Sequence, residues 1–278
     1  MKYHKFSPCQ VLRPFVECYF VWEDETAVSD LVVESPPNGF CSMVFNTGDP
    51  YFLQNKKYDR LAVPLNFVSG QSIYSYKLFL HGRLSITGIV FQPAALASFF
   101  DLPTYLYTEE RIPLETIFPG IQIEELTKKL SDCAEPNEKV KFLEEFLLGH
   151  YKILKPVPDK IDEAANLIVE KNGMLDVSEI MKNSFMSRRN FERKFFKKVG
   201  LSPKYYARLR RMSFLLNQIA GKRKADWASL FSDCEFYDQS HFIKDFMAFT
   251  GRTPQQYLAH NSELANFIDK PTQSGISY

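Results

Sequence analysis

The feature that most constrains the fold of this chain is an internal repeat. Residues 191–206 (FERKFFKKVGLSPKYY) align without gaps with residues 242–257 (FIKDFMAFTGRTPQQY), 51 positions further on. Five aligned positions are identical: Phe191/Phe242, Phe195/Phe246, Gly200/Gly251, Pro203/Pro254 and Tyr206/Tyr257. Because these identities include a glycine and a proline, whose backbone preferences are special, the repeat predicts that one supersecondary unit occurs twice.

Each copy predicts the end of one helix and the start of the next. Phenylalanines four residues apart share one helical face and would fix that helix to a small core. The glycine stands where a helix needs a left-handed residue after its last turn. Ser202-Pro203 and Thr253-Pro254 are an N-cap followed by proline at the first helical position. A long amphipathic helix from Tyr206 to Ile219 is expected to connect the two copies.

A shorter helix and a tight turn precede each repeated segment. In the first unit Asp176 and Glu179 start the short helix, residues 183–186 make the turn and Ser187 caps the longer helix. In the second unit the short helix is 227–233, the turn is 234–237 and the cap is Asp238. A short helix, a tight turn and a longer helix form the helix-turn-helix arrangement.

Residues 160–258 resemble the DNA-binding domain of the AraC/XylS family, most closely over residues 234–257 (CEFYDQSHFIKDFMAFTGRTPQQY). The segments 12–23, 36–49 and 88–100 are similar to a sensor-like domain that precedes such domains. The resemblance implies a transcription regulator that binds double-stranded DNA and does not identify an effector. It also implies RNA polymerase, a small-molecule effector and a second copy of the chain as further candidate partners.

The chain departs from the family at two turn positions. The family usually has glycine in the turn of each helix-turn-helix unit, whereas this chain has Phe185 and Glu235. A non-glycine residue at positive φ costs about 1–3 kcal/mol, unless the turn relaxes to avoid it.

Charge separates the two halves of the chain. Residues 1–155 carry 15 basic and 19 acidic side chains, and residues 156–260 carry 18 basic and 12 acidic ones, which gives −4 against +6. Thirteen basic residues and a single acid, Glu192, lie between Met186 and Lys224. A basic cluster on and beside a recognition helix neutralises phosphates and releases counterions, which favours DNA over a merely solvated face.

The family resemblance assigns roles within the two longer helices. Arg189, Glu192 and Arg193 stand at base-reading positions of the first unit, where arginine suits guanine and glutamate suits cytosine. Arg188, Lys197 and Lys198 are expected to hold phosphates. Gln239, Ser240 and Lys244 are the corresponding residues of the second unit, and neighbouring His241 is as consistent with a solvated side chain as with a phosphate contact.

The first half is predicted to be β-rich. Five segments rich in Val, Ile, Phe and Tyr alternate with turn clusters, which favours a barrel, sandwich or cupin-like fold; they are 16–22, 30–35, 40–46, 72–81 and 84–91. Helices are expected over 94–100, 122–133 and 137–153. We expect the last two helices either to cover the core or to form a dimer surface. The aromatic-rich interior of this half is read as an ordinary core or as a small-molecule pocket.

The resulting expectation is an α+β chain. Residues 1–153 form a sensor or dimerisation domain, 154–159 a proline-containing linker, 160–260 an all-α DNA-binding domain with two helix-turn-helix units joined by a long helix, and 261–278 a tail. Five cysteines without a C-x-x-C pair, no apolar span of 18 residues and no signal peptide favour a cytoplasmic protein without a membrane partner.

Two other classes of function are possible alternatives for such a chain. A metal-dependent cupin-type enzyme would need closely spaced histidines, but His4, His81, His150, His241 and His260 are far apart. Cys9 lacks a nucleophile motif, so no catalytic residue, metal or cofactor is predicted. The second alternative is an adaptor whose helix-turn-helix domain acts by protein–protein contact.

Overall fold

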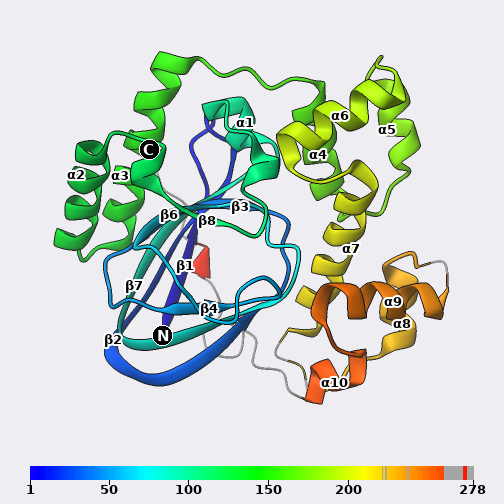
Figure 1. The fold of residues 1–278 in the computed structure, drawn as a ribbon, viewed down its shortest axis with the longest axis horizontal. Helices are drawn as coiled ribbons and strands as arrows, with labels where there is room; N and C mark the ends of the chain where they lie inside the picture. The colour runs from blue at the N-terminus through cyan, green and yellow to red at the C-terminus, as the bar shows by residue number, and fades with distance from the viewer. Residues whose placement is uncertain (221, 223, 237, 260–271, 274–278) are drawn as a thin grey trace.

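The computed structural model describes residues 1–220, 222, 224–236, 238–259 and 272–273. A β-rich N-terminal domain is followed by a helical C-terminal domain, and the two lie side by side (Figure 1). This arrangement confirms the α+β expectation for the two halves of the chain. Arg223, His260 and nearly all of the predicted tail lie outside the described residues.

The strands of the N-terminal domain and β9 of the C-terminal tail form one sheet in the order β8-β6-β3-β7-β2-β1-β9, with β4 pairing with both β5 and β7. Their bounds are β1 Lys2–Phe6, β2 Val16–Ser35, β3 Cys41–Asn46, β4 Phe52–Gln54, β5 Leu61–Ala62, β6 Asn66–Ser69, β7 Tyr76–Phe91, β8 Arg111–Pro113 and β9 Thr272–Gln273. All the pairings are antiparallel except that of β1 with β9.

The two longest strands bend the sheet into two leaves. The first part of β2 pairs with the second part of β7, and the register shifts between Asp24 and Leu31 before the pairing resumes. One leaf continues into β3 and the other into β4. Apolar side chains from both leaves, including Trp22, Val33 and Leu53, pack between them. The segments predicted as strands do lie in strands, but 16–22 and 30–35 are parts of one strand, β2. Likewise 84–91 and most of 72–81 are parts of β7, which begins only at Tyr76.

Helices cover the outer face of the leaf that contains β3. They are α1 Ala95–Phe100, α2 Gly120–Asp132 and α3 Pro136–Leu154, with the short 3₁₀ turns η1 Thr104–Leu106 and η2 Leu114–Thr116 between α1 and α2. Leu126 and Leu130 of α2 and Phe146 and Leu147 of α3 are buried in the core beneath the leaf. The apolar stripes predicted for these two helices therefore cover the core.

The C-terminal domain consists of α4 Lys160–Glu170, α5 Val177–Asn183, α6 Arg188–Val199, α7 Pro203–Ile219, α8 Trp227–Asp233, α9 Gln239–Thr250 and α10 Pro254–Ala259. The pairs α5–α6 and α8–α9 are the two helix-turn-helix units, and α7 joins them (Figure 1). The side chains of Ser187 and Asp238 cap α6 and α9 as predicted. The repeated phenylalanines of both helices are buried in a common core.

The two unusual turn residues adopt the strained conformation rather than a relaxed turn. Phe185 has φ 57° and Glu235 has φ 50°. Phe185 is also 93 % exposed, so its ring gains no burial from its position.

Candidate functional site

The N-terminal half of α6 presents its polar side chains to solvent. Arg188, Arg189 and Arg193 are exposed and Glu192 is half-buried, while Phe191 faces the core. The Arg188 Nε donates to Glu192 at 2.9 Å, and the Arg193 guanidinium donates to the Asn190 side chain at 2.9 Å. Both contacts join side chains of one helix, and the three arginines remain open to solvent.

The matching part of α9 is exposed too. Gln239, Ser240, His241 and Lys244 are exposed. The backbone N–H of His241 donates to the Asp238 cap at 2.7 Å. The helix that follows the second turn therefore presents the same positions as α6, with fewer charges.

Lys198 differs from its exposed neighbour Lys197. Its ammonium lies 2.8 Å from Asp162 and 2.9 Å from Asp159, and it donates to the Ser98 hydroxyl at 3.0 Å. Its side chain is 21 % exposed. Ser98 belongs to α1, so Lys198 joins α6 to the start of α4 and to the N-terminal domain. This ammonium already has two carboxylate partners, an arrangement that does not fit the expected phosphate contact.

Three arginines of α7 also serve internal contacts. Arg208 forms a two-fold hydrogen bond with buried Asp245 of α9. Arg211 donates to the carbonyl oxygens of Glu235 and Gly173. Arg210 donates to the carbonyl oxygen of Asn38 in the N-terminal domain. The basic cluster seen in the sequence thus divides into exposed side chains and side chains that fix the helices and the domains in place.

The interface between the domains is closely packed at two glycines. Gly200, at the end of α6, has φ 86°, and a Cβ there would lie 2.7 Å from the hydroxyl oxygen of Thr108. Gly39 has φ 69°, and a Cβ there would lie 3.1 Å from the side chains of Leu209 and Tyr206. A side chain at either position would strain the backbone, and the neighbouring side chains of the other domain would have to shift to make room for it.

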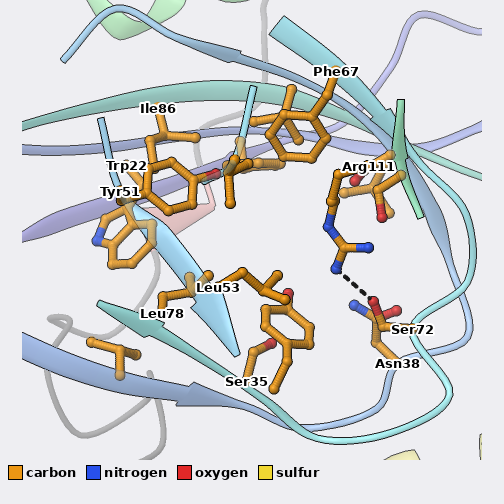
Figure 2. Close-up of a pocket in the computed structure, with 18 of the residues that line it drawn as sticks. Trp22, Ser35, Asn38, Tyr51, Leu53, Phe67, Ser72, Leu78, Ile86 and Arg111 are labelled. Atoms are coloured by element: carbon orange, nitrogen blue, oxygen red, sulfur yellow. Dashed lines mark hydrogen bonds between the residues drawn. The ribbon is translucent and has the colours of Figure 1, made fainter. Parts of the chain in front are cut away.

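A partly open cavity of about 180 Å³ lies between the two leaves of the sheet. We call it the inter-leaf cavity (Figure 2). Its apolar lining includes Trp22, Val33, Leu53, Phe67, Leu78 and Ile86. At one end of the cavity Arg111 lies beside Ser72 and Asn38 (Figure 2).

Arg111 is nearly buried, with 8 % of the residue exposed. Its guanidinium donates to the Glu110 carbonyl oxygen at 2.8 Å and to the Ser72 hydroxyl at 3.1 Å, and it lies 5.3 Å from the centre of the Tyr76 ring. Among the described residues it forms no ion pair within 4.0 Å. No motif marks this residue in the sequence, because Ser72 and the apolar lining come from segments that meet only in the folded chain.

Two segments that line the inter-leaf cavity also contact the C-terminal domain. Asn38 and Phe40 line the cavity, and the guanidinium of Arg210 lies 4.3 Å from the centre of the Phe40 ring. On the other side, Ser72 and Tyr76 line the cavity, and the intervening Ser75 donates its N–H to the Phe249 carbonyl oxygen of α9 at 3.1 Å. The wall of the cavity is thus in direct contact with α7 and α9.

Two negative findings concern other kinds of site. Within the described ranges, no three His, Cys, Asp or Glu side chains gather closely enough to hold a metal ion. No helix in that part of the chain combines the length and apolar character needed to cross a membrane.

Comparison with known proteins matches both domains to families. Residues 4–113 match a domain of unknown function (DUF6597), and residues 180–260 match a helix-turn-helix domain. No curated protein matches the chain.

Among solved structures the chain is similar to ToxT from Vibrio cholerae. One ToxT structure is 13 % identical, with 87 % of this chain and 97 % of that chain covered and a TM-score of 0.45. A ToxT structure with a bound unsaturated fatty acid is 12 % identical, with 85 % and 96 % covered and a TM-score of 0.43.

The matched helix-turn-helix domain spans both repeated units, each with its cap, its buried phenylalanines and its exposed polar face. Residues 180–260 therefore form a helix-turn-helix domain, in agreement with the resemblance of this half of the chain to the AraC/XylS family.

Proposed function

We propose that one copy of the chain reads two successive major grooves of a duplex, with α6 in one groove and α9 in the next. The observation that carries this proposal is the repeated unit, whose two longer helices both expose their N-terminal polar residues. The connecting helix α7 has 17 residues, which at 1.5 Å each is about 26 Å. Once the offsets of α6 and α9 are added, their spacing approaches the ~34 Å between successive major grooves.

The exposed residues divide by role. Arg189, Glu192 and Arg193 contact base edges from α6, and Gln239, Ser240 and Lys244 do so from α9. Arg188 and Lys197 hold phosphates. Lys198, which the sequence grouped with them, is left out of this contact surface because its ammonium joins α6 to α4 and α1. A DNA partner also implies that the protein acts in the cytoplasm.

The N-terminal domain is proposed to regulate DNA binding through an effector in the inter-leaf cavity. The support is the position of the cavity: segments 35–40 and 72–76 line it, and both touch the C-terminal domain. Contact with RNA polymerase and pairing of two copies through the helices predicted at 122–153 stay predictions. A protein–protein adaptor without DNA affinity is the alternative, and the exposed basic residues of α6 argue against it.

A salt titration of the full chain tests the DNA contacts. We expect binding to a duplex selected from a random library to weaken steeply with salt, because phosphate contacts release counterions. Arg193→Ala should cost about 1–3 kcal/mol on the selected duplex and little on a random one. Exposed Arg13 of the N-terminal domain supplies the matched control, Arg13→Ala, which should leave both affinities unchanged. Equal losses of Arg193→Ala on both duplexes would make Arg193 a backbone contact, and no DNA binding at any salt concentration would favour the adaptor.

A further inference from the structure

Two of the base-reading side chains of α6 are held by neighbours on the same helix. The Nη2 group of Arg193 donates to Oδ1 of Asn190, one turn earlier, at 2.9 Å. The Nε of Arg188 donates to Oε1 of Glu192, one turn later, at 2.9 Å. Residues three and four apart are neighbours on a helix surface, so both contacts form within α6 and need no other element.

Each contact leaves hydrogen-bonding groups for DNA. A guanidinium carries more N–H groups than one hydrogen bond uses, so Arg193 keeps a pair of donors for a base edge while it holds Asn190. Glu192 is held through Oε1, which leaves Oε2 to accept a hydrogen bond from a base. Arg188 donates to Glu192 through its Nε, so its terminal amino groups can still reach a phosphate.

The backbone beneath these side chains is fixed as well. Ser187 caps α6, and its hydroxyl accepts from the Asn190 N–H at 3.4 Å. Phe191, next to Asn190, and Phe195, one turn further on, are fully buried. The core face therefore sets the rotation of α6 about its axis, and the rotamers of the polar side chains are the freedom that remains.

Within the described residues, the matching positions of α9 make neither contact. His241 stands where α6 has Asn190, and its ring faces the Asp238 cap, with Nδ1 3.8 Å from a carboxylate oxygen. Ile243 stands where α6 has Glu192, and it packs against the core. The contacts in α6 are thus a feature of that helix and do not follow from the repeat.

We propose that Asn190 and Arg188 are positioning residues: Asn190 orients Arg193, and Arg188 orients Glu192, for the bases that α6 reads. A long side chain loses rotamer freedom when it binds, and one that is already oriented loses less on the correct base. A wrong base gains less, because the held side chain does not turn freely to a new partner. The contacts within α6 therefore raise discrimination between bases more than general affinity for DNA. This inference rests on the proposed function, since it requires that α6 reads base edges.

The test measures how much each single-base change in the selected duplex weakens binding of the full chain. All single-base variants of the duplex compete in one reaction, together with a random duplex. Arg193→Ala and Glu192→Ala first identify the base pairs that each residue reads, as those at which a base change no longer weakens binding. Asn190→Ala should then lower the penalty for a base change at the Arg193 base pairs by roughly threefold and leave binding to the random duplex unchanged.

Arg188→Met should have two separable effects. It should weaken binding to every duplex, because a phosphate contact is lost. It should also lower the penalty for a base change at the Glu192 base pairs by roughly threefold, because the carboxylate is no longer held. A phosphate contact alone would produce only the first effect.

Two further variants separate positioning from a general change in the helix. Asn190→Asp keeps an oxygen that accepts from Arg193 and adds a charge that phosphates repel. It should keep the penalty at the Arg193 base pairs and bind every duplex more weakly. His241→Ala changes the aligned position of α9 and should leave the penalty at the Arg193 base pairs unchanged.

The outcomes separate this inference from the proposed function. If Asn190→Ala or Arg188→Met weakened binding by the same factor on every duplex, or if Asn190→Asp lost the penalty as Asn190→Ala does, the positioning role would be wrong while Arg193 still read its bases. An equal loss of discrimination in His241→Ala would overturn it too. If Arg193→Ala and Glu192→Ala themselves weakened binding equally on every duplex, α6 would read no bases and the proposed function would fail as well.

Discussion

The hydroxyl of Tyr206 in α7 donates a hydrogen bond of 3.0 Å to the carbonyl oxygen of Gly39 in the N-terminal domain. Tyr206 is fully buried, and burial raises the pKa of its hydroxyl. It is one of the repeated residues, so the unit that builds the DNA-binding domain also supplies a contact between domains. The connecting helix is thus held by the segment that lines the inter-leaf cavity.

Tyr206→Phe tests the strength of this contact. The variant keeps the ring and removes the hydroxyl, which leaves the Gly39 carbonyl oxygen without its partner. We expect the free energy of unfolding to fall by about 1–2 kcal/mol in urea titration. Tyr105→Phe is the control: Tyr105 is 41 % exposed and stacks on Phe196 across the same interface, and loss of its hydroxyl should change stability by less than ~0.5 kcal/mol. If Tyr206→Phe lowered the free energy of unfolding no more than Tyr105→Phe does, the hydrogen bond of the Tyr206 hydroxyl would not stabilise the fold.

Lys197 and Lys198 are a matched pair with opposite expected behaviour. Lys197→Met should reduce the slope of log affinity against log salt by about 1, because one phosphate contact is lost. Lys198→Met should leave that slope unchanged. It should instead lower the free energy of unfolding by about 1–3 kcal/mol, since Asp159 and Asp162 lose their shared cation. If Lys198→Met reduced the salt slope and Lys197→Met lowered the free energy of unfolding instead, Lys198 would be a phosphate contact.

The Lys198 cluster also predicts a dependence on pH. Burial opposes the charge of Lys198, but hydrogen bonds from its ammonium to Asp162 and Asp159 outweigh burial and raise the pKa above its ordinary 10.5. A raised pKa in the folded state stabilises the fold fully below the ordinary value, and this stabilisation is lost as the pH rises through the folded-state pKa. The difference in unfolding free energy between wild type and Lys198→Met should therefore be constant from about pH 7 to 9 and narrow above about pH 10.5. A difference that widens at high pH would contradict the assigned pairing.

Phe185→Gly tests the strain in the first turn. Phe185 combines φ 57° with 93 % exposure, so glycine relieves the backbone without exposing a core. We expect a gain of about 1 kcal/mol in the free energy of unfolding, measured in urea. Phe185→Ala keeps the strained backbone and should leave stability nearly unchanged. A glycine variant no more stable than the alanine variant would mean that the turn carries no strain.

The repeat made the helical domain predictable from sequence. Its caps, its buried phenylalanines and its helix bounds follow from local rules, because Ser187, Asp238 and the two repeated glycines act on residues close in the chain. The strands were harder to predict, since β2 and β7 run through a bend that resembles a turn locally and is held only by their mutual pairing.

The residues of the candidate sites also differ in whether they could be predicted from the sequence. The exposed residues of α6 and α9 could be named from the repeat and the family resemblance. The tertiary role of Lys198 could not, because Ser98 is 100 positions away in the chain. The environment of Arg111 was equally hidden, since Ser72 and the apolar lining come from distant segments of the sheet.

The central claim is that one chain carries two reading helices at a fixed separation. Hydroxyl-radical footprinting of the full chain on its selected duplex tests it most directly, at concentrations where sedimentation shows a single copy bound. The account predicts two protected patches about one helical turn apart on one face of the duplex, at a site that need not be palindromic because α6 and α9 differ in sequence. A single protected patch, or protection that requires two copies of the chain, would contradict it.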